Sequence, residues 1–462
     1  MCKKVSVLVL LVIIRVTYSV RITFTSCHHQ NWSCVSNIPN DIVYTCSPRN
    51  SEFIIHLKDF YTDHINTLTV QNCRDLRVVL DCPILQRTSR LQKFVIKDCD
   101  RLEFTTLSSN SLIQTPPEVK IENVREVLSF PKNLFKSPTS NTELKCMGAT
   151  YYKKIHVVHS KINSINTKAI SNVTNIKSVE FENVTITNLQ SQGIEIITNN
   201  DNTLFAMTDS KFENLEPKSL TIHTATTKIL YSIFNDIKAN VINITAVNVH
   251  IVGNTFKEIS ANGININSVN TDITDNIIHS LKTDALANIK CSRRRLNKRH
   301  MNFLRNRIDK LEPYSLYFDH TSCKTAASQI NFRENKIDCK CQNIAFLNSH
   351  LNSEQNSLIL NLSNNNTCLV SCCVLPVEVI KLLLESHMCN LNLDPQVMCL
   401  LYNDKHSVNS SNEVTTDEDV TEPAPTFYLI RQAKANSLHG GAGAAMTALD
   451  RDDLLKDSHL NM

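Results

Sequence analysis

A sequence repeat runs through the centre of the chain and restricts the fold more than any other feature. Seven segments share an apolar residue, a second three positions later and a third five positions after that, and they start at Ile162, Ile186, Phe212, Phe234, Phe256, Ile278 and Ile308. A fixed period in the twenties is typical of solenoids, in which each unit buries its apolar face only against its neighbours. The repeat therefore predicts a solenoid.

The composition of each unit indicates strands. A further apolar residue precedes each triplet by five positions, namely Val157, Phe181, Met207, Ile229, Ile251, Ile273 and Phe303. Stretches such as VNVHI, NTFKEI and GININ alternate apolar and polar residues and are rich in β-branched side chains. Such alternation is typical of strands, so three short strands are expected in each coil.

A polar residue recurs two positions before the triplet, as Ser210, Ser232, Asn254, Asn276, Asn306 and Asn335. Asparagine tolerates the left-handed backbone of tight turns, and its amide can bond the same amide one coil away, at about 4.8 Å. The chain has 51 asparagines and 7 glycines. Asparagine, rather than glycine, is therefore expected to make the turns.

Three strands per coil, short turns and an Asn/Ser ladder resemble the right-handed parallel β-helix of the pectate-lyase-like superfamily, in its non-catalytic secreted form. The resemblance implies an all-β solenoid of roughly eleven coils over residues 66–345. The alternative is a leucine-rich repeat, because VHIVGNTFKEI also fits that consensus. The segments after the asparagine are rich in Asn, Ile, Val and Thr, which are poor helix formers, so we favour the β-helix.

The repeat is expected to extend upstream through three stacked positions. Cys73 and Cys99 are separated by one repeat length, and Val124 follows after another. One coil spacing of about 4.8 Å is within the Cα range for a disulfide, so Cys73 and Cys99 are candidate partners. The alternatives are a Cys73–Cys82 bond or two buried thiols. Residues 20–65 are expected to form an N-terminal cap that contains Cys27, Cys34 and Cys46.

A second cap is expected at residues 346–402, after the repeats. Cys339 and Cys341 close the repeats, Cys368 and Cys389 follow in this cap, and these four cysteines are disulfide candidates. The Cys-x-Cys after the last asparagine position resembles the C-terminal cap of secreted leucine-rich repeat proteins, although the usual tryptophan-containing stretch is absent. Residues 375–389 predict a short amphipathic helix. Residues 403–462, polar and acidic and then Gly-containing, are expected to be disordered.

The N-terminus predicts secretion. Residues 1–19 contain Lys3 and Lys4, an apolar run and then small residues, which is the layout of a signal peptide. Its removal takes Cys2 away from 17 cysteines and leaves an even number, which favours disulfides. No later run is long enough for a transmembrane anchor. Seven sequons are expected to carry glycans: Asn31, Asn172, Asn183, Asn243, Asn361, Asn365 and Asn409.

Enzymatic chemistry is considered because the superfamily includes enzymes that cut acidic polysaccharides. The repeat region offers Asp272 with Asp275 and Asp309 with Glu312. Each pair is a local i, i+3 arrangement, and no carboxylate is expected to align with another on the next coil. Glycoside hydrolysis needs converging carboxylates. We therefore expect turn residues and neither a catalytic site nor a cofactor. The CHHQNWSC segment does not have the spacing of a structural zinc site, so no metal is expected.

One basic cluster falls in the longest step of the repeat, between Ile278 and Ile308, as Arg293, Arg294, Arg295, Lys298 and Arg299. An insertion of this charge can hold an anionic partner or can simply be a solvated loop. Nucleic acid is not expected as a partner, because no aromatic residues are interleaved with the charges. The function that we expect is that of a secreted, non-enzymatic module that binds an extracellular protein or glycan. The alternative function is that of a leucine-rich-repeat receptor-like ectodomain.

Overall fold

The computed structural model describes the chain in segments. These are residues 19–22, 28–29, 32–38, 40–47, 52–60, 65–80, 91–106, 115–137, 152–173, 176–198, 201–292, 299–316, 328–339, 365–370 and 373–376. The chain divides into two compact units, 1–393 and 394–462, and every described residue belongs to the first.

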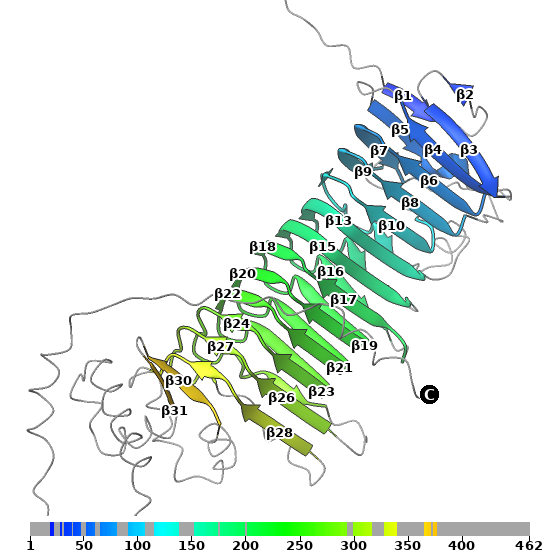
Figure 1. Cartoon of the computed structure of the whole chain (residues 1–462). Coiled ribbons are helices and arrows are strands. Elements are labelled where there is room, and N and C mark those ends of the chain that lie inside the picture. The colour runs from blue at the N-terminus through cyan, green and yellow to red at the C-terminus, as the bar shows by residue number, and fades with distance from the viewer. Residues whose placement is uncertain are drawn as a thin grey trace, which may run out of the picture. The chain divides into compact units, whose positions relative to one another are not determined.

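The described residues form an all-β parallel solenoid with three strand ladders along its length (Figure 1). The first ladder contains β4 (Asp41–Cys46), β6 (Thr67–Gln71), β8 (Lys93–Lys97), β10 (Glu118–Glu122), β13 (Lys154–Ile165), β15 (Ser178–Leu189), β17 (Leu204–Thr208), β19 (Leu220–Leu230), β21 (Ile242–Val252), β23 (Ile264–Thr274), β26 (Arg299–Leu304) and β28 (Ser328–Arg333). From β6 to β28 this ladder has eleven strands, and the solenoid has about nine turns where roughly eleven coils are expected from residues 66–345.

The other two ladders complete each coil. The second contains β1 (Ser19–Ile22), β5 (Glu52–His56), β7 (Asp75–Val79), β9 (Arg101–Thr105), β11 (Glu126–Val127), the second halves of β13 and β15, β18 (Lys211–Leu215), β20 (Ile233–Ile237), β22 (Thr255–Ile259), β24 (Ile277–Ile278), β27 (Arg307–Ile308), β29 (Lys336–Ile337) and β30 (Thr367–Val370). The third contains β12 (Phe135–Lys136), β14 (Ile170–Ser171), β16 (Ile194–Ile197), the first halves of β19, β21 and β23, and β25 (Ile289–Cys291).

This arrangement differs from a leucine-rich repeat. A leucine-rich repeat has one strand per unit followed by a helical or 3₁₀ segment. Here the coils add strands to three ladders, and in the described part of the chain the single helical element is the 3₁₀ turn η1 (Leu57–Phe60), which lies between β5 and β6. The β-solenoid expectation is confirmed.

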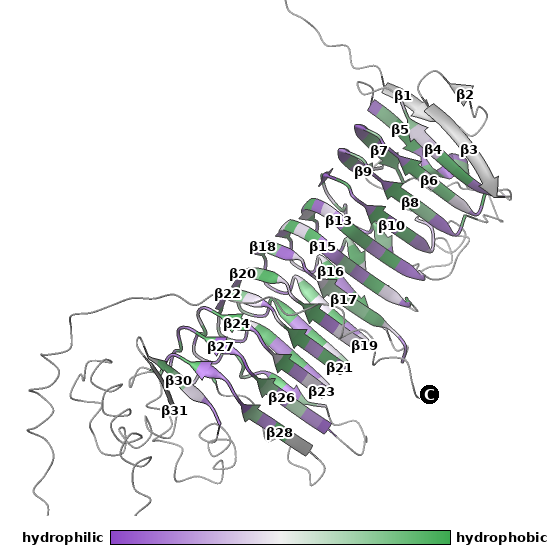
Figure 2. Cartoon of the chain, in the orientation of Figure 1, coloured by the Kyte–Doolittle hydropathy of each residue, from purple (hydrophilic) through white to green (hydrophobic). Residues whose placement is uncertain are grey.

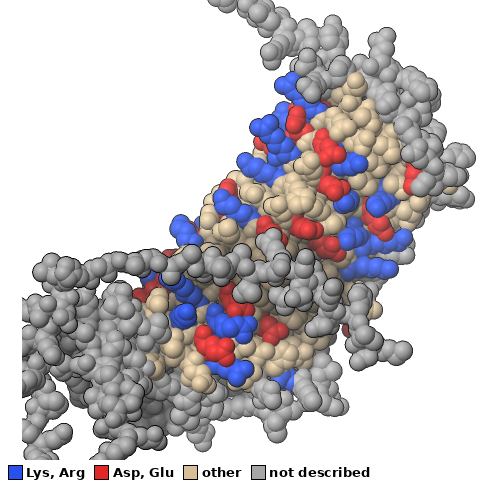
Figure 3. All heavy atoms as spheres, in the orientation of Figure 1, with Lys and Arg blue, Asp and Glu red and all other residues tan. Residues whose placement is uncertain are grey.

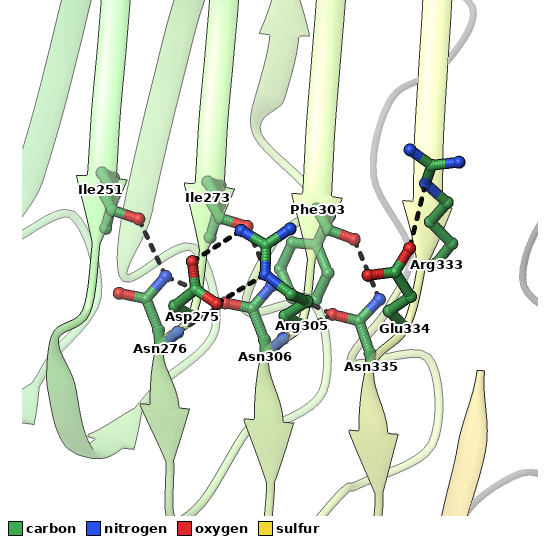
Figure 4. A network of polar contacts seen from close by, with 10 residues as sticks. All are labelled: Ile251, Ile273, Asp275, Asn276, Phe303, Arg305, Asn306, Arg333, Glu334 and Asn335. Carbon is green, nitrogen blue, oxygen red and sulfur yellow. Dashed lines mark hydrogen bonds and ion pairs between the residues drawn. The ribbon is translucent and has the colours of Figure 1, made fainter. Parts of the chain in front are cut away.

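The buried polar ladder is present as expected from the sequence. Asn276 donates through Nδ2 to the Oδ1 of Asn306 at 2.9 Å and to the backbone oxygen of Ile251 at 2.8 Å (Figure 4). The same pattern continues over the positions Asn254, Asn276, Asn306, Asn335 and Asn366, each at most 1% exposed, and begins with the hydroxyls of Ser210 and Ser232. These bonds satisfy buried amides that would otherwise destabilise the fold.

Residues with positive φ occupy the position directly before this ladder, at the turn between the first and second faces. They are Asn72, Asp98, Asn123, His159, Asn183, Asp209, Tyr231, Gly253, Asp275, Arg305, Glu334 and Asn365. Only one of these twelve is a glycine, and asparagine is the commonest residue type. The low glycine content is therefore compatible with a turn in every coil, because asparagine and aspartate tolerate this backbone region.

Hydrophobic and hydrophilic residues alternate along the strands (Figure 2), and the side chains of the hydrophobic ones are buried inside the solenoid. The triplet residues Phe212, Phe234 and Phe256 form a continuous stack, with ring centroids 4.7 and 5.2 Å apart. Such pairs add about 0.5–1.5 kcal/mol to the burial of the rings.

The N-terminal part of the stack corrects two expectations. The parallel ladders already include β4 and β5, so they begin before residue 66, inside the range assigned to the cap. Cys73 and Cys99 do stack on adjacent coils, but the predicted Cys73–Cys99 bond is wrong. Cys73 is bonded to Cys46, with Cα atoms 5.0 Å apart, and Cys99 is free and buried. The first strand of the preceding coil ends at Cys46, and this places the sulfur of Cys46 within bonding distance of the sulfur of Cys73.

Antiparallel strands flank both ends of the described ladders. β2 (His28–His29) pairs with β3 (Trp32–Ile38), and β3 pairs with β4. At the other end β30 pairs with β31 (Cys373–Pro376), and Cys339 is bonded to Cys368, two of the predicted candidates. The predicted helix cannot begin at residue 375, because Leu375 lies in β31. The rest of that helix, Cys341, Cys389 and the tail lie outside the described residues.

Candidate functional site

The most organised polar surface of the described chain is the outer side of the first ladder over β21, β23, β26 and β28. His250, Asp272, Asn302 and Asn331 occupy one column in register, one residue per strand. They point outward because buried residues alternate with them along the strands, as Val249 and Ile251 flank His250. The column is therefore a consequence of strand alternation and of in-register stacking.

Asp272 is the centre of this surface. Its carboxylate lies 3.0 Å from Nδ1 of His250 and 3.4 Å from Nε2 of His300, and it accepts a 2.7 Å hydrogen bond from Nδ2 of Asn302. Partial burial opposes ionisation, but the hydrogen bonds from His250 and Asn302, together with the charge of His300, hold the pKa of Asp272 below its ordinary value.

Amide ladders extend the surface on both sides of Asp272. Asn331 donates to Asn302 at 2.8 Å in the same column, and Asn270 donates to Asn248 at 2.9 Å in the neighbouring column. Each side chain is held by the next coil, so the surface presents donors and acceptors whose rotamers are already ordered. Preordered groups lose less conformational entropy when they bind a partner.

Asp275, the second predicted carboxylate, lies at the left-handed turn and not on this face. It forms a bidentate ion pair with Arg305 on the next coil, at 2.7 and 2.8 Å, beside the buried asparagine ladder (Figure 4). Both side chains are nearly half exposed, so the pair lies in solvent. The structure therefore does not bring Asp275 and Asp272 together at one centre.

Asp309 and Glu312 are on the second face, and each is paired with a cation. Asp309 contacts His279 at 2.6 Å and Arg307 at 2.7 Å; burial opposes ionisation, but these two hydrogen bonds lower its pKa. Glu312 accepts from Lys282 at 2.9 Å and from the backbone amide of Thr283, which lowers its pKa. A general acid needs a raised pKa near neutral pH, so these lowered values do not suit that role.

The expectation that no carboxylates align between coils is wrong at two places. Glu52 is in register with Asp75, and Asp236 is in register with Glu258 on the next coil. Lys257 lies 3.6 Å from Asp236, and Lys282 lies 3.5 Å from Glu258, so each carboxylate has a nearby cation. The sequence could have shown the pair of Asp236 and Glu258, because both residues follow the first triplet position by two.

A second feature, missed by sequence reasoning, is a groove of about 1300 Å³ near the N-terminal end of the stack. Charges of opposite sign alternate along it: Arg101 is in register with Asp75 on one side and with Glu126 on the other. Figure 3 shows the same mixture of acidic and basic side chains over the face in view. This pattern is typical of adjacent strands that stabilise one another through pairs of opposite charge, and it differs from a binding site whose side chains all carry one sign of charge.

The remaining predicted positions are distributed as follows. Arg293, Arg294, Arg295 and Lys298 lie outside the described residues, and Arg299 is the first residue of β26. Among the sequons, Asn31, Asn361 and Asn409 are also outside, whereas Asn172, Asn183 and Asn365 are exposed. Asn243 is held on both sides of its amide, because it donates to the oxygen of Asn240 and accepts from Asn265 at 2.7 Å. Cys291, which the sequence did not single out, is disulfide-bonded.

Within the described ranges, no group of three or more His, Cys, Asp or Glu residues is arranged to hold a metal ion. No helix of that part is long and apolar enough to cross a membrane. No protein-family model, no curated protein and no solved structure matches the chain.

Proposed function

We propose that the protein is a secreted, non-enzymatic solenoid that serves as an extracellular structural or binding module for a protein or glycan. One observation carries the proposal: outward side chains from four successive coils, centred on Asp272, are locked to one another by hydrogen bonds. A rigid array of this kind offers an extended partner several donors and acceptors at a fixed repeat of about 4.8 Å.

Two further observations support the extracellular and non-catalytic parts of the proposal. Disulfides are present at both ends of the described stack, and such bonds persist in oxidising compartments. The carboxylates that sequence analysis singled out all have a cationic or imidazole partner, and Asp272, Asp309 and Glu312 have lowered pKa values. They are held ionised by their neighbours, which suits a structural role better than proton donation.

The test starts with expression of the full chain, with its own N-terminus, in a eukaryotic secretory cell line. We expect the protein in the medium, with a mobility shift after treatment with an N-glycosidase. Retention inside the cells without glycan would contradict the extracellular assignment.

Binding is then measured to immobilised heparin, chitin, cellulose and polygalacturonate and to intact cells. The surface variant is Asn270→Lys with His250→Ala, and the matched control is Lys238→Ala at an exposed turn. We expect binding by the wild type and by the control, and at least tenfold weaker binding by the surface variant. Equal binding by all three proteins, or binding to none of the probes, contradicts the proposed surface. Cleavage of any of these polysaccharides that is lost in Asp272→Asn or Asp275→Asn would show an enzyme instead.

A further inference from the structure

Three cysteines occupy one buried column on three successive coils. Cys46 ends β4, and Cys73 and Cys99 each follow a left-handed residue after β6 and β8, at 8%, 1% and 2% exposure. This is the column that serine and asparagine fill further along the solenoid. Along this column Cys46 and Cys73 are joined by a disulfide, and Cys99, on the other side of Cys73, is a free thiol.

The two neighbours of Cys73 are placed in nearly the same way. Cys46 has its Cα atom 5.0 Å from that of Cys73. On the other side, Gln71 is in register with Lys97, and the backbone amide of Asp100 donates to the oxygen of Cys73 at 2.9 Å. Equivalent residues on adjacent parallel strands lie about 4.8 Å apart, which is inside the Cα range of disulfides.

We propose that Cys73 has two alternative disulfide partners, and that detachment of the first coil converts the Cys46–Cys73 bond into a Cys73–Cys99 bond. The disulfide then moves one coil inward, stays inside the remaining stack and releases the thiol of Cys46. This inference does not depend on the proposed function, because it concerns the integrity of the solenoid and not its outer surface.

The chemical step is a thiol–disulfide exchange and needs no oxidant. The Cys99 thiol gives its proton to solvent, its thiolate attacks Sγ of Cys73, the new S–S bond forms, and Cys46 leaves as a thiolate that solvent protonates. In the closed solenoid the step is suppressed, because burial raises the pKa of Cys99 to about 12 and few thiolates are present near neutral pH. Detachment of the first coil exposes the coil that carries Cys73, and transient opening of that second coil then hydrates Cys99 and removes this protection.

The experiment uses the full oxidised chain, without reductant, at pH 8.5. One sample is native and the other is in urea just below the unfolding midpoint; both are then quenched with iodoacetamide, digested with trypsin and analysed by mass spectrometry. Trypsin separates the two cysteines, since Cys73 is in peptide 59–74 and Cys99 is in peptide 98–101. In urea we expect the 59–74 peptide to be linked to 98–101 and Cys46 to be alkylated, at least tenfold more than in the native sample.

Two variants separate this inference from general scrambling. Cys99→Ala must keep the Cys46–Cys73 bond under the same conditions. Cys46→Ser, refolded with oxidised glutathione, should form the Cys73–Cys99 link and lose two hydrogens in mass. The proposal is overturned if Cys73 stays bonded to Cys46 in urea. It is also overturned if Cys99 remains free while Cys73 is linked to the Cys82 peptide 78–87, alkylated or glutathionylated.

Discussion

The side-chain oxygen of Asn306 accepts two hydrogen bonds from Asn276, at 3.0 Å from its backbone nitrogen and at 2.9 Å from its side-chain nitrogen. Asn276 in turn accepts the same two bonds from Asn254. Each asparagine is therefore hydrogen-bonded both to the coil before it and to the coil after it, so the buried ladder links successive coils.

The first prediction concerns this ladder. Asn276→Ala leaves the buried backbone amide of Asn254 and the oxygen of Ile251 without a partner, so we expect a loss of about 3 kcal/mol in the free energy of unfolding. The measurement is equilibrium denaturation in urea. Asn288→Ala is the control, because that half-buried side chain makes one surface bond to Asn262, and it should cost less than about 1 kcal/mol. Equal losses of unfolding free energy in the two variants would show that the buried ladder stabilises the fold no more than a surface hydrogen bond does.

The second prediction concerns Gly253, the only glycine in the column of left-handed turn residues. Its φ is +68°, and an added Cβ would lie 2.5 Å from the ring of Tyr231 on the preceding coil. Gly253→Ala should lower stability by about 1–2 kcal/mol through backbone strain and the clash. Adding Tyr231→Ala should relieve the clash and restore that part of the lost stability, whereas the backbone strain at residue 253 remains. A double-mutant cycle of unfolding free energies measures this coupling, and strict additivity would rule out the contact.

The third prediction concerns the reactivity of Cys99. Burial raises its pKa to about 12, so iodoacetamide at pH 8 should leave it unmodified in the native protein and modify it rapidly in 8 M urea. Peptide 98–101 reports the modification by mass spectrometry. Modification of the native protein at the rate of the unfolded chain would show that the column is open to solvent.

The fourth prediction concerns acid stability. The pKa of Asp272 is lower in the folded chain than its ordinary value of 3.8, so its ionised form stabilises the fold. That contribution is fully present above the ordinary pKa and is lost as the pH falls through the folded value, below about pH 4. Asp272→Asn should therefore flatten the decline of thermal stability below pH 4. Asp201→Asn, at an exposed turn, is the matched control, and an identical decline in Asp272→Asn and the wild type would contradict the assignment.

Much of the solenoid could be predicted from local sequence pattern. The triplets and the preceding apolar residues are buried core positions, and the recurring Ser or Asn forms the expected ladder. These features were predictable because a residue that fills the same position in every coil meets its own counterpart, so spacing alone identifies its neighbour.

The disulfide at Cys73 was not predictable in this way. Spacing placed Cys73 and Cys99 correctly on adjacent coils, but the coil before them lacks the triplet pattern and was assigned to the cap. Either neighbour in a column satisfies the distance for a disulfide, so the choice depended on where the first coil begins. Only the pairing of β4 with β6 shows that Cys46 is in reach.

The cluster around Asp272 illustrates the same division. The sequence predicted that Asp272 is a turn residue, and that prediction is wrong, because Asp272 lies on β23 and faces outward between the buried residues Thr271 and Ile273. The sequence by itself did not determine the partners. His250 lies on the coil before Asp272, and His300 lies on the coil after it. The contact between Asp272 and His300 therefore depends on the register in which β26 pairs with β23 after the longest repeat. Residue pattern sets the period and the core, whereas the length of each turn sets the register, and it is the register that decides which polar groups meet.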